Sequence, residues 1–360
     1  MFRQLCCFVI AAMCAAGAPA SAARAGQGVA MPIKVVIVTT YEVGEDTGDV
    51  PGEFQYWVER EPLDEKLAFP GGVRSLRLNA SHDVLGVVTG MTLANAGPTI
   101  MALGLDPRFD LSHAYWLVAG IAGVDPADGT IGTAAWARFV VNDVARQIDA
   151  REMPAAWPYG LFVIGAKAPG EMPKSPMTDD EYALNASLTD WAYGLTKDLK
   201  LEDNAVMAEN RKRWASVPAA SRPPGVMEGD SFASDQYWHG TVLTQYANDW
   251  VKLWTGGKGN FVMANMEDSA IAEALRRLER MGRADYRRLM VLRVASNYSE
   301  EAPGQTALGS VTAPYIRSTA LVNTWLTGSV VVHELQKKWP AYERVTAGDR
   351  ETAAGSGAER

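Results

Sequence analysis

Cysteine is nearly absent from this chain of 360 residues: its three cysteines, Cys6, Cys7 and Cys14, all lie near the N-terminus. The remainder can therefore form no disulfide and offers no thiol nucleophile or cysteine ligand for a metal. Such a chain must be held together by its hydrophobic core. Its length is sufficient for one large α/β domain or for two smaller ones.

Long apolar runs and positive charge are also scarce. Beyond the N-terminal segment, no apolar stretch approaches the ~18 residues of a transmembrane helix, and the longest, 114–124, is interrupted by glycine. This predicts no transmembrane segment in the mature chain, and hence a soluble protein. Lys and Arg number 34 against 42 Asp and Glu, a formal net charge of −8. That balance argues against nucleic acid or an anionic membrane surface as a partner.

The N-terminus has the pattern of a secretory signal peptide. Arg3 supplies positive charge, 5–16 form a short apolar core, and small residues allow cleavage after Ala22 or Ala25. We therefore expect residues 1–22 or 1–25 to be removed and the mature protein to be periplasmic or secreted. Loss of Arg3 and Arg24 would bring the formal net charge to about −10.

Histidine is sparse as well, and the four residues are scattered: His82, His113, His239 and His333. They lack the H-x-x-x-H spacing of a metal-binding helix, so we expect no metal. The chain also lacks a P-loop, a G-x-G-x-x-G fingerprint and a G-x-S-x-G elbow, and we expect no cofactor. His239 lies beside a predicted amphipathic helix, and we interpret it as an interior histidine.

What the mature chain does contain is an alternation of β-branched runs and helical patterns. Strands are predicted at 34–40, 84–89, 115–119, 135–141, 261–264 and 290–297, and helices at 93–103 and 234–254. This alternation predicts the α/β class. We expect a single domain at about 33–336, with a central mixed, mostly parallel β-sheet flanked by helices.

Two stretches differ in composition from this pattern. The middle segment, 150–224, is rich in proline and carries a polar helical pattern at about 180–209. We interpret it as an insertion or lid and not as a separate domain. Residues 347–360 are of low complexity and are expected to form a disordered tail.

Two short motifs follow predicted strands in the C-terminal half. Met266 and Glu267 come after the strand 261–264, and Arg293, Ser296 and Asn297 lie within or at the end of 290–297. In open α/β sheets, small molecules bind where strands end and helices begin. A carboxylate at one strand end and a carboxamide at another therefore predict a ligand crevice.

These motifs resemble the Met-Glu and Arg-x-x-Ser-Asp signatures of the purine nucleoside phosphorylase and nucleosidase superfamily. Three further segments match in order: 89–92 is similar to its Gly-Met-Gly turn, 118–123 to its Gly-x-Ala-Gly loop and 228–232 to its Gly-Asp-x-Phe turn. Apart from the middle segment, the chain most resembles the purine nucleoside permease family, which shares that fold and is named for nucleoside uptake. The resemblance implies a purine nucleoside as ligand.

The resemblance also implies roles for individual residues. Glu267 would accept hydrogen bonds from the ribose 2′- and 3′-hydroxyls, Met266 would pack under the sugar, and Phe232 would stack on the purine. Glycine-containing turns would face an anion or water beside the ribose: Gly90, Met91, Thr92 and Gly120. The residues alone leave other interpretations open, because Glu267 also suits a helix N-terminus and Phe232 suits a core.

Asn297 departs from the superfamily pattern, which commonly has aspartate there. An aspartate can carry a proton to the purine N7, whereas a carboxamide can only donate a hydrogen bond. The change suits a 6-oxopurine and disfavours adenosine. Two alternatives stay open: Asn297 caps the next turn, and Arg293 either positions the neighbouring loop or is a paired strand arginine.

The loop that would face the attacking nucleophile differs from that of the phosphorylases, which have an arginine where this chain has Val118. Without a guanidinium there, a phosphate dianion would be held poorly, so hydrolysis is favoured over phosphorolysis. Glu42 lies near the position of the water-activating glutamate of the nucleosidases, and it is our candidate general base. Asn297 is the second candidate catalytic residue, as the group that would face the purine. Four acidic residues of the following loop are rivals to it: Glu45, Asp46, Asp49 and Glu53.

Three functional classes remain open at this point. The chain could be an exported purine nucleosidase, a nucleoside-binding component of uptake without turnover, or a protein that kept the fold and lost the ligand. Retention of Glu267 and Phe232 argues against the third class. By analogy with the superfamily we expect a homo-oligomer, and an uptake role would require a partner transporter.

Overall fold

The computed structural model describes residues 29–313 and 318–349. The predicted signal peptide and residues 350–360 of the predicted tail lie outside the described residues. Residues 347–349, which we had assigned to the tail, are instead helical and packed on the domain. Ala347 is buried, and its backbone N–H donates to the hydroxyl of Tyr115 at 3.0 Å.

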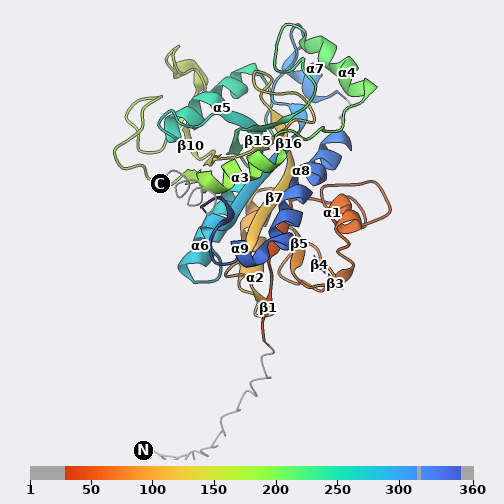
Figure 1. The fold of residues 1–360 in the computed structure, drawn as a ribbon. Helices are drawn as coiled ribbons and strands as arrows, with labels where there is room; N and C mark the ends of the chain where they lie inside the picture. Colours follow the sequence, from red (N-terminus) through yellow and green to blue (C-terminus); the bar gives the residue numbers. More distant parts are fainter. Residues whose placement is uncertain (1–28, 314–317, 350–360) are drawn as a thin grey trace, which may run out of the picture.

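Twelve of the described strands form one mixed sheet (Figure 1). Its main path runs through β12 (Glu181–Ala183), β9 (Phe139–Asn142), β14 (Asp230–Ala233), β15 (Phe261–Asn265), β7 (Tyr115–Val124), β2 (Val35–Thr39), β5 (Val84–Val88), β4 (Leu76–Leu78) and β3 (Glu65–Leu67). A branch beside β7 adds β16 (Leu289–Tyr298), β8 (Ala134–Trp136) and β13 (Val226–Glu228). The central strands β5, β2, β7 and β16 are parallel. This confirms the predicted α/β class with a central mixed sheet.

Helices cover both faces of this sheet (Figure 1). On one face α2 (Leu93–Gly104) packs against α6 (Asp268–Arg280), and on the other α8 (Ser318–Lys337) lies along β7 and β16 beside α1 (Gln55–Arg60) and α3 (Ala186–Thr196). The remaining helices and turns are α4 (Ala205–Arg211), α5 (Thr241–Trp254), α7 (Ala307–Val311), α9 (Trp339–Tyr342), η1 (Ala150–Glu152), η2 (Lys212–Trp214) and η3 (Tyr286–Arg288). None of the helices in the described ranges combines the length and hydropathy needed to span a bilayer.

Two short strand pairs lie apart from the main sheet: β1 (Met31–Pro32) with β6 (Phe109–Asp110), and β10 (Ala145–Gln147) with β11 (Leu161–Val163). Within the sheet, β2 shows how the core is divided. Val36 and Val38 belong to the core under α2 and α6, whereas Val35 and Ile37 belong to the core under α8. A strand buried on both faces reads as an unbroken apolar run, which is what the sequence shows here.

The structure differs from the sequence prediction where pairing extends or interrupts an element. We expected a strand at 115–119 and a loop after it, but β7 continues to Val124 because β16 pairs with it to that residue. The helix expected at 234–254 begins at Thr241, since Gly240 has a φ of 129°. The strand expected at 135–141 is divided between β8 and β9, which lie in different parts of the sheet.

The middle segment is built into the domain. The polar helical pattern at 180–209 is in fact β12 followed by α3 and α4, because Asn185 and Asn204 each begin a new helix. β12 extends the sheet through β9, and α3 packs beside α8. The last part of the segment, α4 and η2, lies near α7 at one end of the molecule (Figure 1).

Candidate functional site

A cavity of about 520 Å³ opens near the ends of β2, β15 and β16, against the second half of β7. Side chains far apart in the sequence meet in its wall, among them Thr40, Glu53, Ile121, Met266, Glu267 and Asn297. Pockets that enclose small organic ligands commonly have volumes of ~300–1,000 Å³. The cavity therefore stands where the strand-end motifs predicted a ligand crevice.

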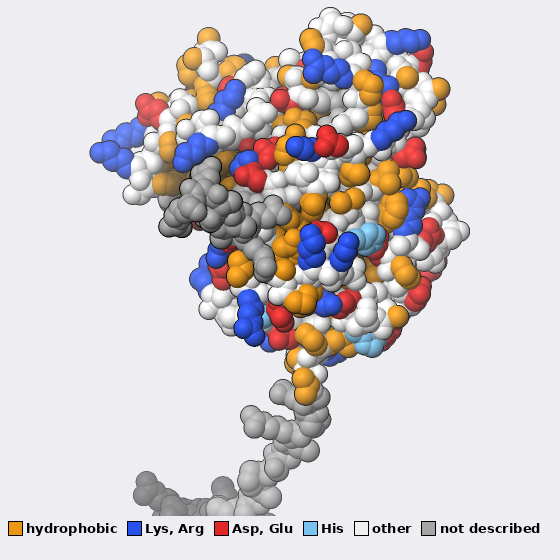
Figure 2. Space-filling view, viewed as in Figure 1, with side chains coloured by type: hydrophobic (Ala, Val, Ile, Leu, Met, Phe, Trp, Pro, Cys, Tyr) orange, Lys and Arg blue, Asp and Glu red, His pale blue; other side chains and the backbone are white. Residues whose placement is uncertain are grey.

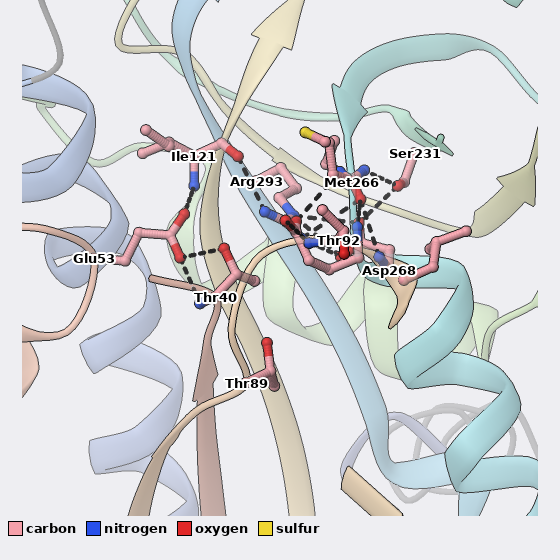
Figure 3. Close-up of polar contacts among 12 residues, drawn as sticks. Thr40, Glu53, Thr89, Thr92, Ile121, Ser231, Met266, Asp268 and Arg293 are labelled. Atoms are coloured by element: carbon pink, nitrogen blue, oxygen red, sulfur yellow. Dashed lines mark hydrogen bonds and ion pairs between the residues drawn. The ribbon is translucent and has the colours of Figure 1, made fainter. Parts of the chain in front are cut away.

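A buried arginine organises the floor of this cavity (Figure 3). Arg293, on β16, is 1 % exposed. Its Nη2 donates to Asp268 Oδ1 at 2.5 Å and to Glu267 Oε2 at 3.0 Å, and its Nη1 donates to the carbonyl of Ile121 at 3.0 Å. Burial opposes the charge, but Asp268 and Glu267 raise the pKa of Arg293 above its ordinary value. Arg293 is thus a paired strand arginine that fixes two carboxylates, and it does not line the cavity itself.

Glu267 lies at the start of α6 and forms part of the cavity wall, with 4 % of its surface exposed. Its Oε2 accepts from Arg293 and from the backbone N–H of Met266 at 3.2 Å, and its Oε1 accepts from Thr92 N–H at 3.3 Å. A carboxylate has about four acceptor positions, so about one on Oε1 is left for a ligand. Burial raises the pKa of Glu267; Arg293 opposes this, and Asp268 adds to it.

Glu53 provides a second buried carboxylate in the same wall, and it is 3 % exposed. Its Oε1 accepts from Ile121 N–H at 2.7 Å, and its Oε2 accepts from the N–H and hydroxyl of Thr40 at 2.6 and 2.8 Å (Figure 3). Burial raises the pKa of Glu53 to about 7, with Arg293 opposing and Glu267 contributing. A carboxyl group that titrates near neutrality can accept a proton from water.

Glu42, our candidate base, occupies a different place. Its carboxylate accepts hydrogen bonds from the backbone N–H groups of Val43, Gly52, Phe54 and Gln55, and it does not line the cavity. These bonds tie the loop after β2 to the start of α1, which is a structural task. The loop carboxylate that lines the cavity is Glu53, one of the rivals to Glu42 in the same loop.

Gly120 lies on β7 where Glu53 and Arg293 approach each other. A Cβ atom at this position would lie 2.5 Å from Arg293 Nη1 and 2.8 Å from Glu53 Oε1. We expected Gly120 to face an anion or water, but it does not line the cavity. Its importance is steric, because only a residue without a side chain leaves room for the two charged groups.

The turn at 90–92 reaches the site through its backbone. Gly90 and Thr92 have positive φ values of 83° and 78°, and the second is unusual for a residue with a branched side chain. This turn brings the N–H of Thr92 to Glu267 and places Met91 in the cavity wall. The Thr92 amide thus donates to Glu267, and not to an anion as we had expected.

Phe232 lies behind the cavity wall. It is fully buried and packs edge-on against Trp238, Tyr246 and Phe261, with ring centroids 5.8 to 6.0 Å away. It does not line the cavity, so the structure does not support our assignment of Phe232 as the residue that stacks on the base. Four other aromatic residues do line the cavity: Tyr41, Trp214, Tyr237 and Tyr298.

Asn297 lines the cavity and is held by its neighbours. Its Oδ1 accepts from the hydroxyl of Ser296 at 3.1 Å, and its Nδ2 donates to the carbonyl of Tyr298 at 3.0 Å. One N–H of the carboxamide is left for a ligand.

His239 is also in the wall, and burial lowers the pKa of its imidazole, with Glu301 acting in the opposite sense.

The middle segment supplies part of the site that the sequence analysis missed. Asn210, Arg213 and Trp214 line the cavity, and Trp214 packs on Tyr298 with ring centroids 4.3 Å apart. These residues carry no periodic or strand-end signal in the sequence. Within the described ranges, no group of three or more His, Cys, Asp or Glu is arranged to hold a metal ion.

Comparison with known sequences assigns the family. The model of the purine nucleoside permease family matches residues 32–346, and so includes the middle segment. The chain belongs to the purine nucleoside permease family. Among curated members, a probable purine nucleoside permease of Schizosaccharomyces pombe is 30 % identical over 72 % of this chain and 78 % of its own. A purine nucleoside permease of Candida albicans is 26 % identical over 79 % of this chain and 72 % of its own.

Solved structures show the fold that this permease family member shares. A 5′-methylthioadenosine/S-adenosylhomocysteine nucleosidase of Helicobacter pylori aligns with a TM-score of 0.51 at 15 % identity, covering 84 % of this chain and 98 % of its own. The futalosine hydrolase of the same organism aligns with a TM-score of 0.52 at 15 % identity and the same coverage. At this identity the likeness establishes a nucleosidase-like fold and nothing finer.

Proposed function

We propose that this protein binds a purine nucleoside and hydrolyses its N-ribosidic bond. The observation that carries the proposal is the pairing of two buried carboxylates in one cavity, Glu267 with an acceptor position free and Glu53 with a pKa raised by burial to about 7. Family membership supports nucleoside handling, and the site chemistry supports cleavage.

The two carboxylates suit the two demands of the reaction. Cleavage of a ribosyl–purine bond passes through an oxocarbenium-like state, in which positive charge develops on the sugar. Glu267 accepts a hydrogen bond from the ribose diol and stabilises that charge. Glu53 takes a proton from water as the water oxygen bonds to C1′ and the bond from C1′ to the purine nitrogen breaks.

The same charges favour water over phosphate as the acceptor. Glu53 and Glu267 act on each other electrostatically. Among the described residues, the buried cation near them is Arg293, and it is already paired with Asp268 and Glu267. A phosphate dianion next to Glu53 would meet carboxylates and no free guanidinium. Water carries no such penalty.

Asn297 sets the expected base preference. Its remaining N–H can donate to the purine N7 but cannot transfer a proton, so the base must leave with hydrogen-bond assistance alone. A 6-oxopurine tolerates this better than adenine. Inosine and guanosine are therefore the proposed substrates, in preference to adenosine.

A second candidate is nucleoside capture without turnover, as a component of uptake. The observation that favours it is again Asn297, because the site holds no acid at the position facing N7. On this alternative a partner transporter would receive the nucleoside. The two candidates differ only in whether free base is released.

The experiment that separates them is a base-release assay on the purified protein lacking residues 1–25. Inosine, guanosine and adenosine are each incubated with and without phosphate, and free base and sugar product are separated by chromatography. We expect base release without phosphate, and a loss of at least ~100-fold in the Glu267→Gln variant. Saturable binding without release would establish capture, and release only with phosphate would contradict hydrolysis.

Asn297→Asp sharpens this assay. An aspartate at this position supplies the missing acid, so adenosine cleavage should rise relative to inosine cleavage. An unchanged ratio would show that Asn297 does not face the base.

We also propose export, on the basis of the signal-peptide pattern. N-terminal sequencing of the protein recovered from the periplasmic fraction should begin at residue 23 or 26; recovery in the cytoplasm with Met1 intact would contradict export.

Homo-oligomerisation remains a proposal by analogy, and sedimentation of the purified protein tests it: a monomer at micromolar concentration would contradict it.

A further inference from the structure

One cation at the cavity mouth is not used by the chemistry proposed above. We call the partly or fully exposed lining residues of α4, η2 and the region of α7 the cavity mouth: Asn210, Arg213, Gln305, Ser310 and Val311. Arg213 is the sole Lys or Arg in the described lining of the cavity. The acidic residues of that lining, Glu53 and Glu267, are both buried in the floor.

Arg213 stands out from the two cations that precede it in the sequence. Arg211 is held by Asp203, with Nη1 to Oδ1 at 2.8 Å and Nη2 to Oδ2 at 2.7 Å. Lys212 pairs with Glu209. Arg213 forms no ion pair with any described residue, and it is the one of the three that lines the cavity. Side chains of both signs are interspersed over the molecular surface visible in Figure 2.

Arg213 also lies apart from the carboxylate floor. The cation that acts on Glu53 and Glu267 is Arg293, and Arg213 is not among the groups that shift either pKa. Arg213 is therefore not placed to hold a phosphate nucleophile beside Glu53. The other polar residues that line the mouth carry no carboxylate: they offer the carboxamides of Asn210 and Gln305 and the hydroxyl of Ser310. Guanidinium, amide and hydroxyl donors together suit an oxyanion.

The position of the other ligand groups indicates which part of a nucleoside reaches this mouth. A purine nucleoside has three distinct ends, which are the base, the 2′,3′-diol and the 5′ carbon. On the proposed function, the floor takes the diol at Glu267 and the base at Asn297. The 5′ carbon is left to face the mouth, where Arg213 lies.

We propose that Arg213 binds an anionic group attached to the 5′ carbon, so that the cavity takes purine nucleoside 5′-monophosphates. A phosphate monoester carries a charge of about −1.5 to −2 at neutral pH and three acceptor oxygens, which match the planar fork of an arginine. This inference rests on the proposed function for the orientation of the nucleoside. It extends that function from free nucleosides to nucleotides as ligands.

The test compares binding by calorimetry in the Glu53→Gln background, where the ligand is not consumed. The ligands are inosine, inosine 5′-monophosphate, inosine with a carboxylate at C5′, and inosine together with inorganic phosphate. We expect the 5′-monophosphate to bind about 10–100-fold more tightly than inosine. Arg213→Gln should weaken binding of the 5′-monophosphate at least tenfold more than binding of inosine.

Lys212→Gln is the matched control, because it removes a neighbouring positive charge that does not line the cavity. It should leave both affinities within twofold. A loss of affinity for the 5′-monophosphate equal to that in Arg213→Gln would show general electrostatics and overturn the proposal. Preference for the 5′-carboxylate over the 5′-monophosphate would overturn the phosphate assignment.

Two further outcomes separate this inference from the proposed function. Binding of inosine with no preference for its 5′-monophosphate, together with cleavage of inosine by the protein that keeps Glu53, overturns the inference and leaves the nucleosidase proposal standing. Binding of inosine that tightens with free inorganic phosphate, and loses that effect in Arg213→Gln, overturns the inference in favour of a phosphate co-substrate. Failure of every purine ligand to bind, in both the parent and Arg213→Gln, contradicts the proposed function itself.

Discussion

The floor of the cavity and its mouth hold their charges in different ways. In the floor, Arg293 is buried between Asp268 and Glu267, and three carboxylates share its field. At the mouth, Arg213 is exposed and without an ion pair to any described residue. Buried charges interact strongly and must be paired, whereas exposed charges are screened by solvent and contribute little to stability. On the proposed function, the floor is therefore fixed before a ligand arrives, and the ligand completes the mouth.

The two regions also come from different parts of the fold. The floor is carried by the ends of β2, β7 and β16, by the start of α6, and by the loop between β2 and α1 that holds Glu53. The mouth is carried by α4, η2 and α7, which lie at one end of the molecule (Figure 1). Loops that a rigid scaffold positions commonly carry functional residues, and here the central sheet positions the loop that holds Glu53.

The largest expected effect is on catalysis at the floor. Glu53→Gln removes the proposed base while keeping the shape of the side chain, and should lower kcat/KM for base release by about 10²–10⁴-fold. Glu42→Gln, in the same loop but outside the cavity, is the control. Equal losses in both variants would show that the loop, and not Glu53, matters.

A large effect on stability should accompany the loss of the floor cation. Arg293→Met leaves Asp268 and Glu267 buried without their partner and should reduce the free energy of unfolding by about 3–5 kcal/mol. Urea denaturation followed by tryptophan fluorescence measures it. A change below 1 kcal/mol would show that the carboxylates are held by their other hydrogen bonds.

The pH dependence of turnover should follow Glu53. Its pKa is raised from 4.5 to about 7, so the ionised form that accepts a proton accumulates above neutrality. Below that pH, kcat/KM should fall about tenfold per unit, which is about 100-fold at pH 5. The same shift affects stability. Between pH 4.5 and about 7, the folded protein keeps a proton on Glu53 that the unfolded chain releases, so the contribution of Glu53 to stability falls as the pH rises through this range. Residual activity of Glu53→Gln with an unchanged profile would assign the titration to another group.

A smaller effect is expected from crowding the floor. Gly120→Ala places a Cβ between Arg293 and Glu53, and overpacking of this kind costs about 1–3 kcal/mol. Gly194→Ala, at a helical position with nothing within 4 Å of the new atom, is the matched control and should be neutral or slightly stabilising. Equal stability of the two variants, measured by thermal unfolding, would show that the two charged groups can move apart.

The smallest effect is expected at the mouth. Arg213→Met makes the same change as Arg293→Met but on an exposed arginine, and should alter the free energy of unfolding by less than about 0.5 kcal/mol. The pair of variants thus measures the difference between floor and mouth directly, by the same urea denaturation. A loss at Arg213 close to that at Arg293 would mean that the mouth is structurally built in.

Much of the framework was predictable from local patterns. The β-branched runs that became β2, β5, β15 and β16 lie within one or two residues of their expected bounds, because an unbroken apolar run bounded by polar residues strongly favours a buried strand. Met266, Glu267 and Asn297 were expected at a crevice for the same reason, because they lie at or just after the ends of such strands, and all three line the cavity.

Residues whose side-chain direction depends on distant packing were not predictable in this way. Glu42 and Glu53 share one loop and the same chemistry, and only the path of that loop over β7 turns Glu53 to Ile121 and leaves Glu42 on backbone amides. Phe232 follows a recognised turn, yet the aromatic residues of α5 and β15 enclose it.

The sequence by itself determined the α/β class, the places where strands end, and the presence of a carboxylate and a carboxamide there, because these follow from periodicity and neighbouring residues. The tertiary structure decided which loop carboxylate lines the cavity, why Gly120 must be glycine, and that Arg213 of the middle segment lines the same cavity. Burial and electrostatic pairing depend on residues brought together from distant parts of the chain, and these act on one another only after folding has placed them side by side.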